Sequence, residues 1–255
     1  MSETYGSTKA AIYNTSSSNQ KIVVHTFEYN SNIQSNYTML FDKTTKCALW
    51  VAYKHNKTEY KDENVGRNDG WHYDPALDQS WQANLSYSYR DASGKSYDRG
   101  HQVASEDRQT TVAQNQQTFY YSNMTPQYSS LNQGQWKTSV EERIQALATV
   151  TRDNQELYVV TGPLFEGTIQ YTTDRDGANC AIPTGYYKCV IRCTYDNAGN
   201  MTAASGCAYI VETNSANVTA TLTSIDYVES KTGFDFFANL PDAFENTAEA
   251  QSTTL

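Results

Sequence analysis

Apolar positions along the chain predict one clear amphipathic helix. Between residues 132 and 149, apolar side chains recur every three or four positions, as they do on one face of a helix: Trp136, Val140, Ile144, Leu147 and Ala148. Residues 224–233 predict a second, shorter helix. We expect it to stop at Gly233, because glycine readily adopts the left-handed conformation that ends helices.

Short apolar runs predict the strands, and the turn-forming residues 196–200 predict a hairpin between two of them. Strands and helices mix without a regular βαβ rhythm. This mixture predicts an α+β fold with a mainly antiparallel central sheet and flanking helices. The expected strands are residues 46–53, 119–122, 156–161, 186–194 and 203–212.

Both ends of the chain are polar and lack periodicity. We therefore expect a flexible segment over residues 1–20, a single domain over 21–245 and a flexible tail over 246–255. No apolar run approaches the roughly 20 residues that a membrane helix needs, so we expect no membrane partner. Twenty tyrosines and four tryptophans argue against general disorder, because aromatic side chains carry large buried areas.

The net charge of −9 argues at first against a nucleic-acid partner. The charge is uneven, however. Residues 205–255 contain one Lys and seven Asp or Glu, so this last fifth of the chain holds two thirds of the excess. The remaining chain is close to neutral and can bind phosphates through local cations.

Five cysteines are present, and none lies in a CxxC motif, so a zinc knuckle or thioredoxin-like site is not expected. Four of them cluster between residues 180 and 207. Clustered cysteines in a chain rich in Tyr, Ser, Thr and Asn favour a secreted, periplasmic or cell-surface protein, although no leader is visible. Buried thiols in a cytosolic protein are the alternative. A hairpin centred on Ala198 would place Cys189 opposite Cys207, which suggests a disulfide.

Residues 97–101 read Tyr-Asp-Arg-Gly-His and combine the groups that phosphate chemistry needs. An arginine can hold a phosphate through two hydrogen bonds. A neutral imidazole can take a proton from water near neutral pH. By itself this short motif is weak evidence, because a solvated turn that contains a His by chance is more common.

Asn123 and Asn132 lie nine residues apart, around a turn and the start of the main helix. An Asn side-chain oxygen is a hard, neutral ligand that suits Mg²⁺, which keeps most of its waters and needs few protein ligands. The alternatives are a helix N-cap for Asn132 and a turn residue for Asn123.

Together, these segments resemble the DNA/RNA non-specific endonucleases, the sugar-non-specific ββα-metal nucleases that include the endonuclease G type. The matching order and spacing extend from about residue 38 to residue 243. The segments are LWVAY at 49–53, DRGH at 98–101, SNMTPQ at 122–127, LNQGQW at 131–136, VVTGP at 159–163, IPTGYYK at 182–188 and TGFDFF at 232–237.

The resemblance implies a role for each matching residue. His101 would be the general base that activates water, and Asn132 would be the sole direct protein ligand of a hydrated Mg²⁺, with Mn²⁺ or another divalent ion able to replace it. Arg99 would contact the phosphate and stabilise charge. Asp98 would support the water shell of the metal or orient the motif, and Asn123 would position His101 or the substrate.

One feature departs from the family pattern. The family places a Glu four residues after the helix tryptophan, but here Glu141 stands one residue later. A shift of one residue turns a helix face by about 100°. Glu141 is the better candidate to hold a metal-bound water, with Glu142 as the alternative. Arg143 is the nearest match to the family's following arginine, and Lys54 would contact phosphate.

The implied activity is Mg²⁺-dependent hydrolysis of DNA and RNA by a nuclease domain that contains a ββα-metal motif. Family analogy alone also suggests a homodimer. Three alternatives stay open: a Mg²⁺-independent phosphodiesterase, an exported aromatic-rich module that binds a ligand such as carbohydrate, and a catalytically degenerate nuclease fold.

Overall fold

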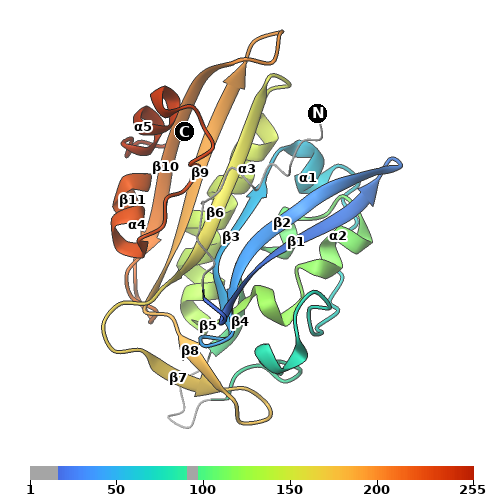
Figure 1. Ribbon diagram of the computed structural model, residues 1–255, viewed down its shortest axis with the longest axis vertical. Coiled ribbons are helices and arrows are strands. Elements are labelled where there is room, and N and C mark those ends of the chain that lie inside the picture. Colours follow the sequence, from blue (N-terminus) through green and yellow to red (C-terminus); the bar gives the residue numbers. More distant parts are fainter. Residues whose placement is uncertain (1–16, 91–96) are drawn as a thin grey trace.

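A seven-stranded antiparallel sheet forms the centre of the protein (Figure 1). The computed structural model describes residues 17–90 and 97–255. Each strand pairs with its neighbour in antiparallel register, which confirms the predicted fold class. Across the sheet, the strands are β1 (Gln20–Tyr29), β2 (Asn32–Asp42), β3 (Cys47–Lys54), β6 (Gln155–Leu164), β9 (Gly185–Tyr195), β10 (Met201–Val211) and β11 (Thr221–Thr223).

Helices and two small sheets surround the central sheet. The helices are α1 (Lys57–Lys61), α2 (Val112–Gln117), α3 (Glu142–Val150), α4 (Ile225–Thr232) and α5 (Asp242–Glu249). Three short 3₁₀ turns and one π-helical segment add to them: η2 (Gln79–Trp81), η3 (Ser105–Asp107), η4 (Tyr121–Asn123) and η5 (Leu131–Glu141). The small sheets pair β4 (Tyr97–His101) with β5 (Met124–Tyr128) and β7 (Gln170–Thr173) with β8 (Asn179–Ile182).

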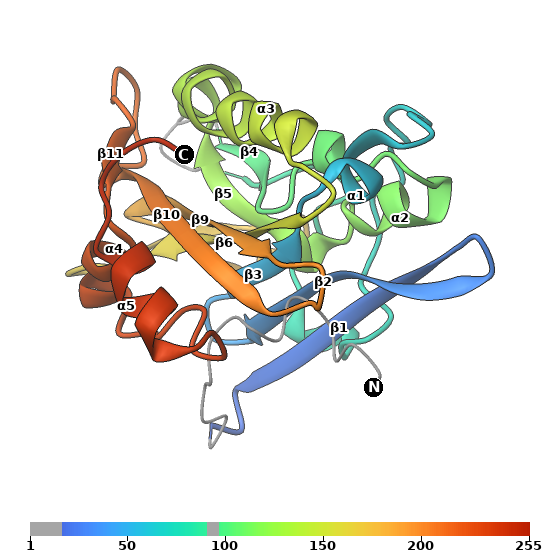
Figure 2. The same cartoon turned by 90° about the horizontal axis from the view of Figure 1, so that it is seen from above.

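Both faces of the central sheet are covered, which explains why strands β3, β6 and β9 are buried along most of their length. Figure 2 shows α4 and α5 on one face, with α3, β4 and β5 on the other. Ile225, Val228 and Ala248 fill the core beneath α4 and α5. Trp136 and Ile144, from η5 and α3, fill the second core on the opposite face.

The predicted ββα arrangement is present on the face that carries α3. The paired strands β4 and β5 lead directly into η5 and then α3. The predicted helix over 132–149 therefore exists as two consecutive helical segments. Its apolar stripe is buried as expected: Trp136, Val140, Ile144 and Ala148.

Most strand predictions are confirmed, and so is the helix that starts after Ser224. The Ser224 side chain caps that helix, and Gly233 ends it with φ +71°. The predicted strand over 119–122 is wrong, because these residues lead into the 3₁₀ turn η4. Phe119 and Tyr121 are apolar there because the turn itself is buried. The pattern gave no sign of strands β1 and β2.

The predicted Cys189–Cys207 disulfide is also wrong. The hairpin of β9 and β10 forms, but a register shift between Met201 and Ala203 pairs Cys189 with Ala208. Neighbouring residues of a strand point to opposite faces, so Cys189 and Cys207 lie in the two different cores. All five cysteines are buried, and none of them forms a disulfide. The expectation of export therefore loses the support of a disulfide.

The ends of the chain differ from the sequence expectation. Residues 1–16 of the expected flexible segment lie outside the described residues, and β1 already begins at Gln20. The expected flexible tail from residue 246 is wrong in part, because its first residues complete α5, where Ala248 is fully buried. Leu255 packs against the second core. No helix among the described residues is long and apolar enough to cross a membrane.

Candidate active site

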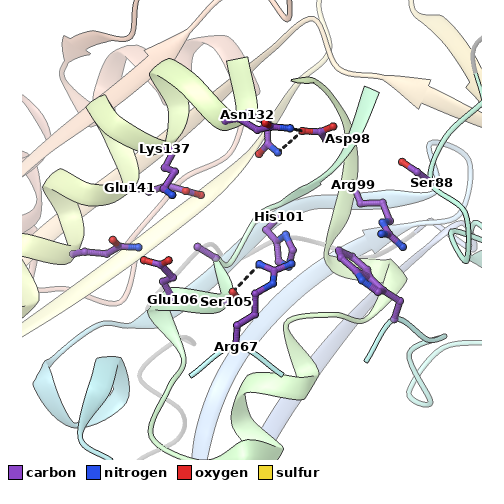
Figure 3. A pocket seen from close by; sticks show the side chains of 14 residues that line it. Arg67, Ser88, Asp98, Arg99, His101, Ser105, Glu106, Asn132, Lys137 and Glu141 are labelled. Atoms are coloured by element: carbon purple, nitrogen blue, oxygen red, sulfur yellow. Dashed lines mark hydrogen bonds between the residues drawn. The ribbon is translucent and has the colours of Figure 1, made fainter. Parts of the chain in front are cut away.

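A cavity of about 660 Å³ opens between β4, η5 and the segment around Arg67. Figure 3 shows the side chains that converge on it. Five of the predicted site residues line this cavity: Asp98, Arg99, His101, Asn132 and Glu141. The ββα arrangement brings together residues that lie up to 43 positions apart in the sequence.

Strand β4 supplies three of these residues, and the glycine between them lets the strand lie close to β5. A Cβ on Gly100 would come within 2.4 Å of the Gln127 Cβ on β5. Only glycine avoids that clash. The short DRGH motif therefore combines chemical side chains with a residue that the strand pairing requires.

Asp98 fixes the orientation of Asn132. The Asn132 Nδ2 group donates to Asp98 Oδ2 at 2.9 Å, and the Gln133 side chain donates to the same oxygen at 2.8 Å. The second oxygen, Oδ1, accepts from the Ser129 hydroxyl at 2.7 Å. Because a carboxylate can only accept, the amide nitrogen of Asn132 must face Asp98. The amide oxygen is left as the group that Asn132 can offer to a cation.

Glu141 reaches the same cavity despite its shift in the sequence. The last turn of η5 is π-helical, because the Glu142 amide donates to the Lys137 carbonyl five residues before it; the non-helical Gly134 separates this turn from the start of η5. In a π-helical turn, residues five positions apart lie above one another, as residues four positions apart do in an α-helix. Glu141, five positions after Trp136, therefore takes the place of a residue four positions after it in an α-helix. Glu141 lines the cavity, while Glu142 is exposed on α3.

The environment of Glu141 disfavours its charged form. Burial raises the pKa of Glu141 to about 7, and the nearby Lys188 ammonium only partly offsets that effect. Lys188 is itself fully buried and lies 3.6 Å from Asp107 Oδ2. A cation placed in the cavity would favour the ionised form of Glu141.

His101 is held as a neutral imidazole. Burial and the charge of Arg67 lower its pKa to about 3. Its ring lies edge-on to Trp71 and Phe119, with ring centroids 5.4 and 5.2 Å away. The ring makes a hydrogen bond to the Arg99 backbone, but its buried Nε2 atom has no hydrogen-bond partner among the described residues. This nitrogen is the one that can accept a proton.

Two arginines supply positive charge to the cavity. The Arg99 guanidinium lies 3.6 Å from the centre of the Trp71 ring and donates to the Leu85 carbonyl at 3.0 Å. The Arg67 side chain donates to the Ser105 hydroxyl at 3.2 Å and pairs with the exposed Asp69 at 2.9 Å. Both guanidinium groups retain donors that can bind a phosphate.

Asn123 does not reach the cavity. It is fully buried, and its side chain joins the Val103 amide and carbonyl at 3.1 and 3.0 Å and the Thr118 carbonyl at 2.9 Å. Its backbone carbonyl also accepts from Gln102 at 3.0 Å. Asn123 therefore fixes the chain directly after His101, and its placement disagrees with direct contact to a substrate.

Lys54 and Arg143 also lie outside the residues that line the cavity. The Lys54 ammonium is 3.0 Å from Glu156 and 3.8 Å from Glu59, so its charge is already paired. Arg143 lies on the exposed side of α3 and forms a hydrogen bond with the Tyr209 side chain. Burial raises the pKa of Tyr209, and this hydrogen bond partly offsets the rise. Both cations thus lie away from this cavity, and the contact of Lys54 with phosphate stays a prediction.

Three charged residues at the cavity were not predicted: Arg67, Glu106 and Lys137. Lys137 lies four residues before Glu141, and Gln145, which also lines the cavity, lies four residues after it. Helical spacing from Glu141 could have identified both. Arg67 and Glu106 lie outside any periodic segment, and no local pattern marks them.

The donors around the cavity fit a cation that keeps most of its waters. Among the described residues, no three His, Cys, Asp or Glu side chains at this cavity lie close enough to share an ion. The oriented Asn132 oxygen and the Glu141 carboxylate are both hard oxygen donors. A site with so few protein ligands suits Mg²⁺, which keeps several of its waters. It does not suit a metal that needs a full set of protein ligands.

Comparisons with known proteins identify the family of this chain. Residues 17–243 match the sequence profile of DNA/RNA non-specific endonucleases. The nuclease of Serratia marcescens is 31% identical over 243 residues, which cover 94% of this chain and 83% of that protein. The nuclease of Nostoc sp. is 27% identical over 225 residues, or 86% and 77% of the two chains.

Two further relatives are of the endonuclease G type. Human mitochondrial endonuclease G is 31% identical over 165 residues, which cover 62% of this chain and 53% of that protein. A solved structure of an EndoG/EndoGI complex has the same fold, with a TM-score of 0.62, 20% identity and coverage of 87% and 89%. With the profile match over most of its length, the chain belongs to the DNA/RNA non-specific endonuclease family of metal-dependent hydrolases.

Proposed function

We propose that this protein is a Mg²⁺-dependent endonuclease that hydrolyses the phosphodiester bonds of both DNA and RNA at the cavity of β4 and η5. One observation carries the proposal. A neutral imidazole without a partner on Nε2, an arginine and an oriented Asn132 oxygen all enter the same cavity. The relatives named as nucleases support the same chemistry.

His101 is the general base of the proposed reaction. A water that enters the cavity can donate a hydrogen bond to the unpartnered Nε2 atom, which then takes its proton as the oxygen attacks phosphorus. The new P–O bond forms while the P–O3′ bond breaks, and the leaving oxygen takes a proton from solvent. Because the nucleophile is water and not a ribose 2′-hydroxyl, DNA and RNA are both substrates.

Arg99 and Arg67 bind the phosphate and stabilise the charge that develops on it. Positioned cations of this kind act most strongly where water is partly excluded. The Trp71 ring fixes the Arg99 guanidinium at one wall of the cavity. The Arg99 donors that do not bond to Leu85 would bind the phosphate.

Asn132 and Glu141 would hold the metal ion at the opposite wall, Asn132 directly and Glu141 through a water. When bound, the ion supplies positive charge to the non-bridging and leaving oxygens of the phosphate. Asp98 positions Asn132 for this role, because its carboxylate fixes which way the amide points. Asn123 positions His101 through the backbone of Gln102 and Val103.

The test compares plasmid DNA and RNA cleavage by the wild-type protein, by His101→Ala and by His72→Ala. We expect His101→Ala to lose turnover by about 10²–10⁴-fold, the usual contribution of a general base. His72 is exposed and does not line the cavity, so its variant controls for the loss of an imidazole. EDTA should abolish cleavage, and added Mg²⁺ should restore it.

Each part of the proposal has an outcome that contradicts it. Full activity of a folded His101→Ala protein would remove the base assignment. Cleavage that persists in EDTA would indicate a metal-independent phosphodiesterase. A well-folded wild-type protein that cuts neither nucleic acid with Mg²⁺ present would indicate a degenerate nuclease fold or a binding module.

A further inference from the structure

The acidic last fifth of the chain forms a carboxylate cluster on the face of the sheet that the catalytic cavity does not use. Helices α4 and α5 carry Asp226, Glu229 and Glu249, and both helices pack on the face away from α3, β4 and β5 (Figure 2). The proposed nuclease reaction assigns no role to these residues.

The three carboxylates lie close enough to share an ion. One oxygen from each of Asp226, Glu229 and Glu249 lies within 4.8 Å of the others. Two ligands on opposite sides of a calcium ion are themselves about 4.6–5.2 Å apart, because each Ca–O bond measures about 2.3–2.6 Å. The three oxygens are therefore close enough together for all of them to reach one calcium ion.

A second observation is independent of the clustering. Glu249 is only 5% exposed, and its Oε1 atom is buried without a hydrogen-bond partner among the described residues. The Oε1 atom of Glu245, one turn earlier on α5, is also buried without a partner. Burying such acceptors without a donor is unfavourable, and a bound cation would reduce that cost.

The protein provides little positive charge to this cluster. The four charged neighbours that act most strongly on Glu249 are all acids: Glu229, Glu245, Asp226 and Asp235. Lys231, the lysine of α4, has its ammonium 3.2 Å from Glu166 and 3.0 Å from Glu212. Burial and these acids raise the pKa of Glu249 to about 9, so protons neutralise the cluster when no cation is bound.

We propose that Asp226, Glu229 and Glu249 bind one calcium ion that joins α4 to α5. Calcium is favoured over magnesium because it accepts several carboxylates and irregular geometry, whereas Mg²⁺ prefers near-ideal octahedral sites and retains its waters. The accessible Asp226 leaves room for water ligands on the outer side. The ion stabilises the fold and takes no part in phosphodiester cleavage.

The experiment measures the melting temperature of the full chain with and without about 1 mM CaCl₂, a concentration typical of extracellular calcium sites. The background is Asn132→Ala, so that an ion at the catalytic cavity does not contribute. We expect calcium to raise the melting temperature, because an ion that binds only the folded state stabilises it. Adding Glu249→Gln or Asp226→Asn should remove most of this rise.

Glu142→Gln on α3 is the matched control, since it removes one exposed acid elsewhere and should keep the full calcium response. Without calcium at pH 8, Glu249→Gln should melt no earlier than the parent, because burial raises the pKa of Glu249 to about 9 and its side chain is already mostly neutral at that pH. Asp226→Asn changes an exposed side chain and provides a second test that does not depend on core packing. A melting temperature that calcium does not change, or a rise that both variants retain, would overturn the proposal.

Discussion

On one face of the central sheet, the cavity combines three cations with three acids, whereas the cluster on the opposite face contains acids alone: Asp226, Glu229 and Glu249. The net charge of −9 is a sum over the whole chain, so it does not show the charge of either region. Local charge, not net charge, decides whether this protein can approach a nucleic acid. With only three cations at the cavity, we expect weak binding whose affinity falls by only a few powers of the salt concentration, because few phosphate contacts can form.

The two faces also differ in how they treat a carboxylate. At the cavity, Asp98 accepts hydrogen bonds from Ser129, Asn132 and Gln133. Beneath α5, the Glu249 Oε1 atom accepts none. A carboxylate with all its partners in the protein serves as a support for other side chains. A buried carboxylate without hydrogen-bond partners is available to bind a cation.

Asp98→Ala gives the largest expected effect among the tests of this comparison. Without the carboxylate, the Asn132 amide loses the contact that sets its orientation. The Mg²⁺ concentration that supports half-maximal cleavage should rise by about 10–100-fold, the usual loss when a supporting partner of a metal ligand is removed. Titrations of cleavage against Mg²⁺ measure this shift.

Ser129→Ala is the matched control for Asp98→Ala, because it removes a partner of the other Asp98 oxygen and leaves the Asn132 contact intact. It should change the Mg²⁺ requirement only slightly. The calcium response of the α4–α5 cluster should persist in both variants. Equal effects of the two substitutions would contradict the positioning role of Asp98, and loss of the calcium response would contradict the independence of the two faces.

Four of the predicted residues that line the cavity lie in two segments whose order is specific, 98–101 and 131–136, and this is why they could be predicted from the sequence. The sequence could not show that η5 is π-helical, which decides how Glu141 meets Asn132. It also could not locate Arg67, which reaches the cavity from a polar segment without periodicity. Tertiary packing, not local pattern, determines both features.

The misplaced predictions share a similar cause. Lys54 stands next to a recognisable strand motif, but Glu156 from the neighbouring strand pairs with it, and strand pairing is not visible in one segment alone. The Cys189 pairing failed for a related reason. Because of the one-residue register shift in β10, every residue beyond it faces the side of the sheet opposite to the one that an unshifted hairpin would give.

The pH dependence of metal binding should distinguish the cavity from a site with ordinary carboxylates. Burial raises the pKa of Glu141 to about 7, so its proton competes with the cation below that pH. The apparent Mg²⁺ affinity should fall about tenfold between pH 8 and pH 6, since the ionised fraction of a group with this pKa falls by that factor. His101 does not contribute, because its pKa of about 3 keeps it neutral throughout.

Glu141→Gln should bind Mg²⁺ more weakly and lose this pH dependence, whereas Glu142→Gln should retain it. Mg²⁺ titrations of cleavage at pH 6, 7 and 8 provide the measurement. If the pH dependence survives in Glu141→Gln, another group at the cavity is responsible, and the role assigned to Glu141 is wrong.

Lys137 and Lys54 provide the smallest and most selective test of the charge comparison. Lys137 is exposed and lines the cavity, whereas Lys54 lies outside it and pairs with Glu156. Lys137→Met should raise KM a few-fold and reduce the slope of log affinity against log salt by about 1, the effect of losing one phosphate contact.

Lys54→Met should leave the salt slope unchanged and cost at most about 1 kcal/mol of stability, the usual limit for an accessible ion pair. KM measured on the same substrate over a range of NaCl concentrations, at constant Mg²⁺, separates the two cases. Equal changes in slope would mean that phosphates contact a surface that extends beyond the cavity to the end of β3. An unchanged slope in both variants would mean that the arginines and the metal ion alone hold the substrate, because no other cation at the cavity rim would then contribute.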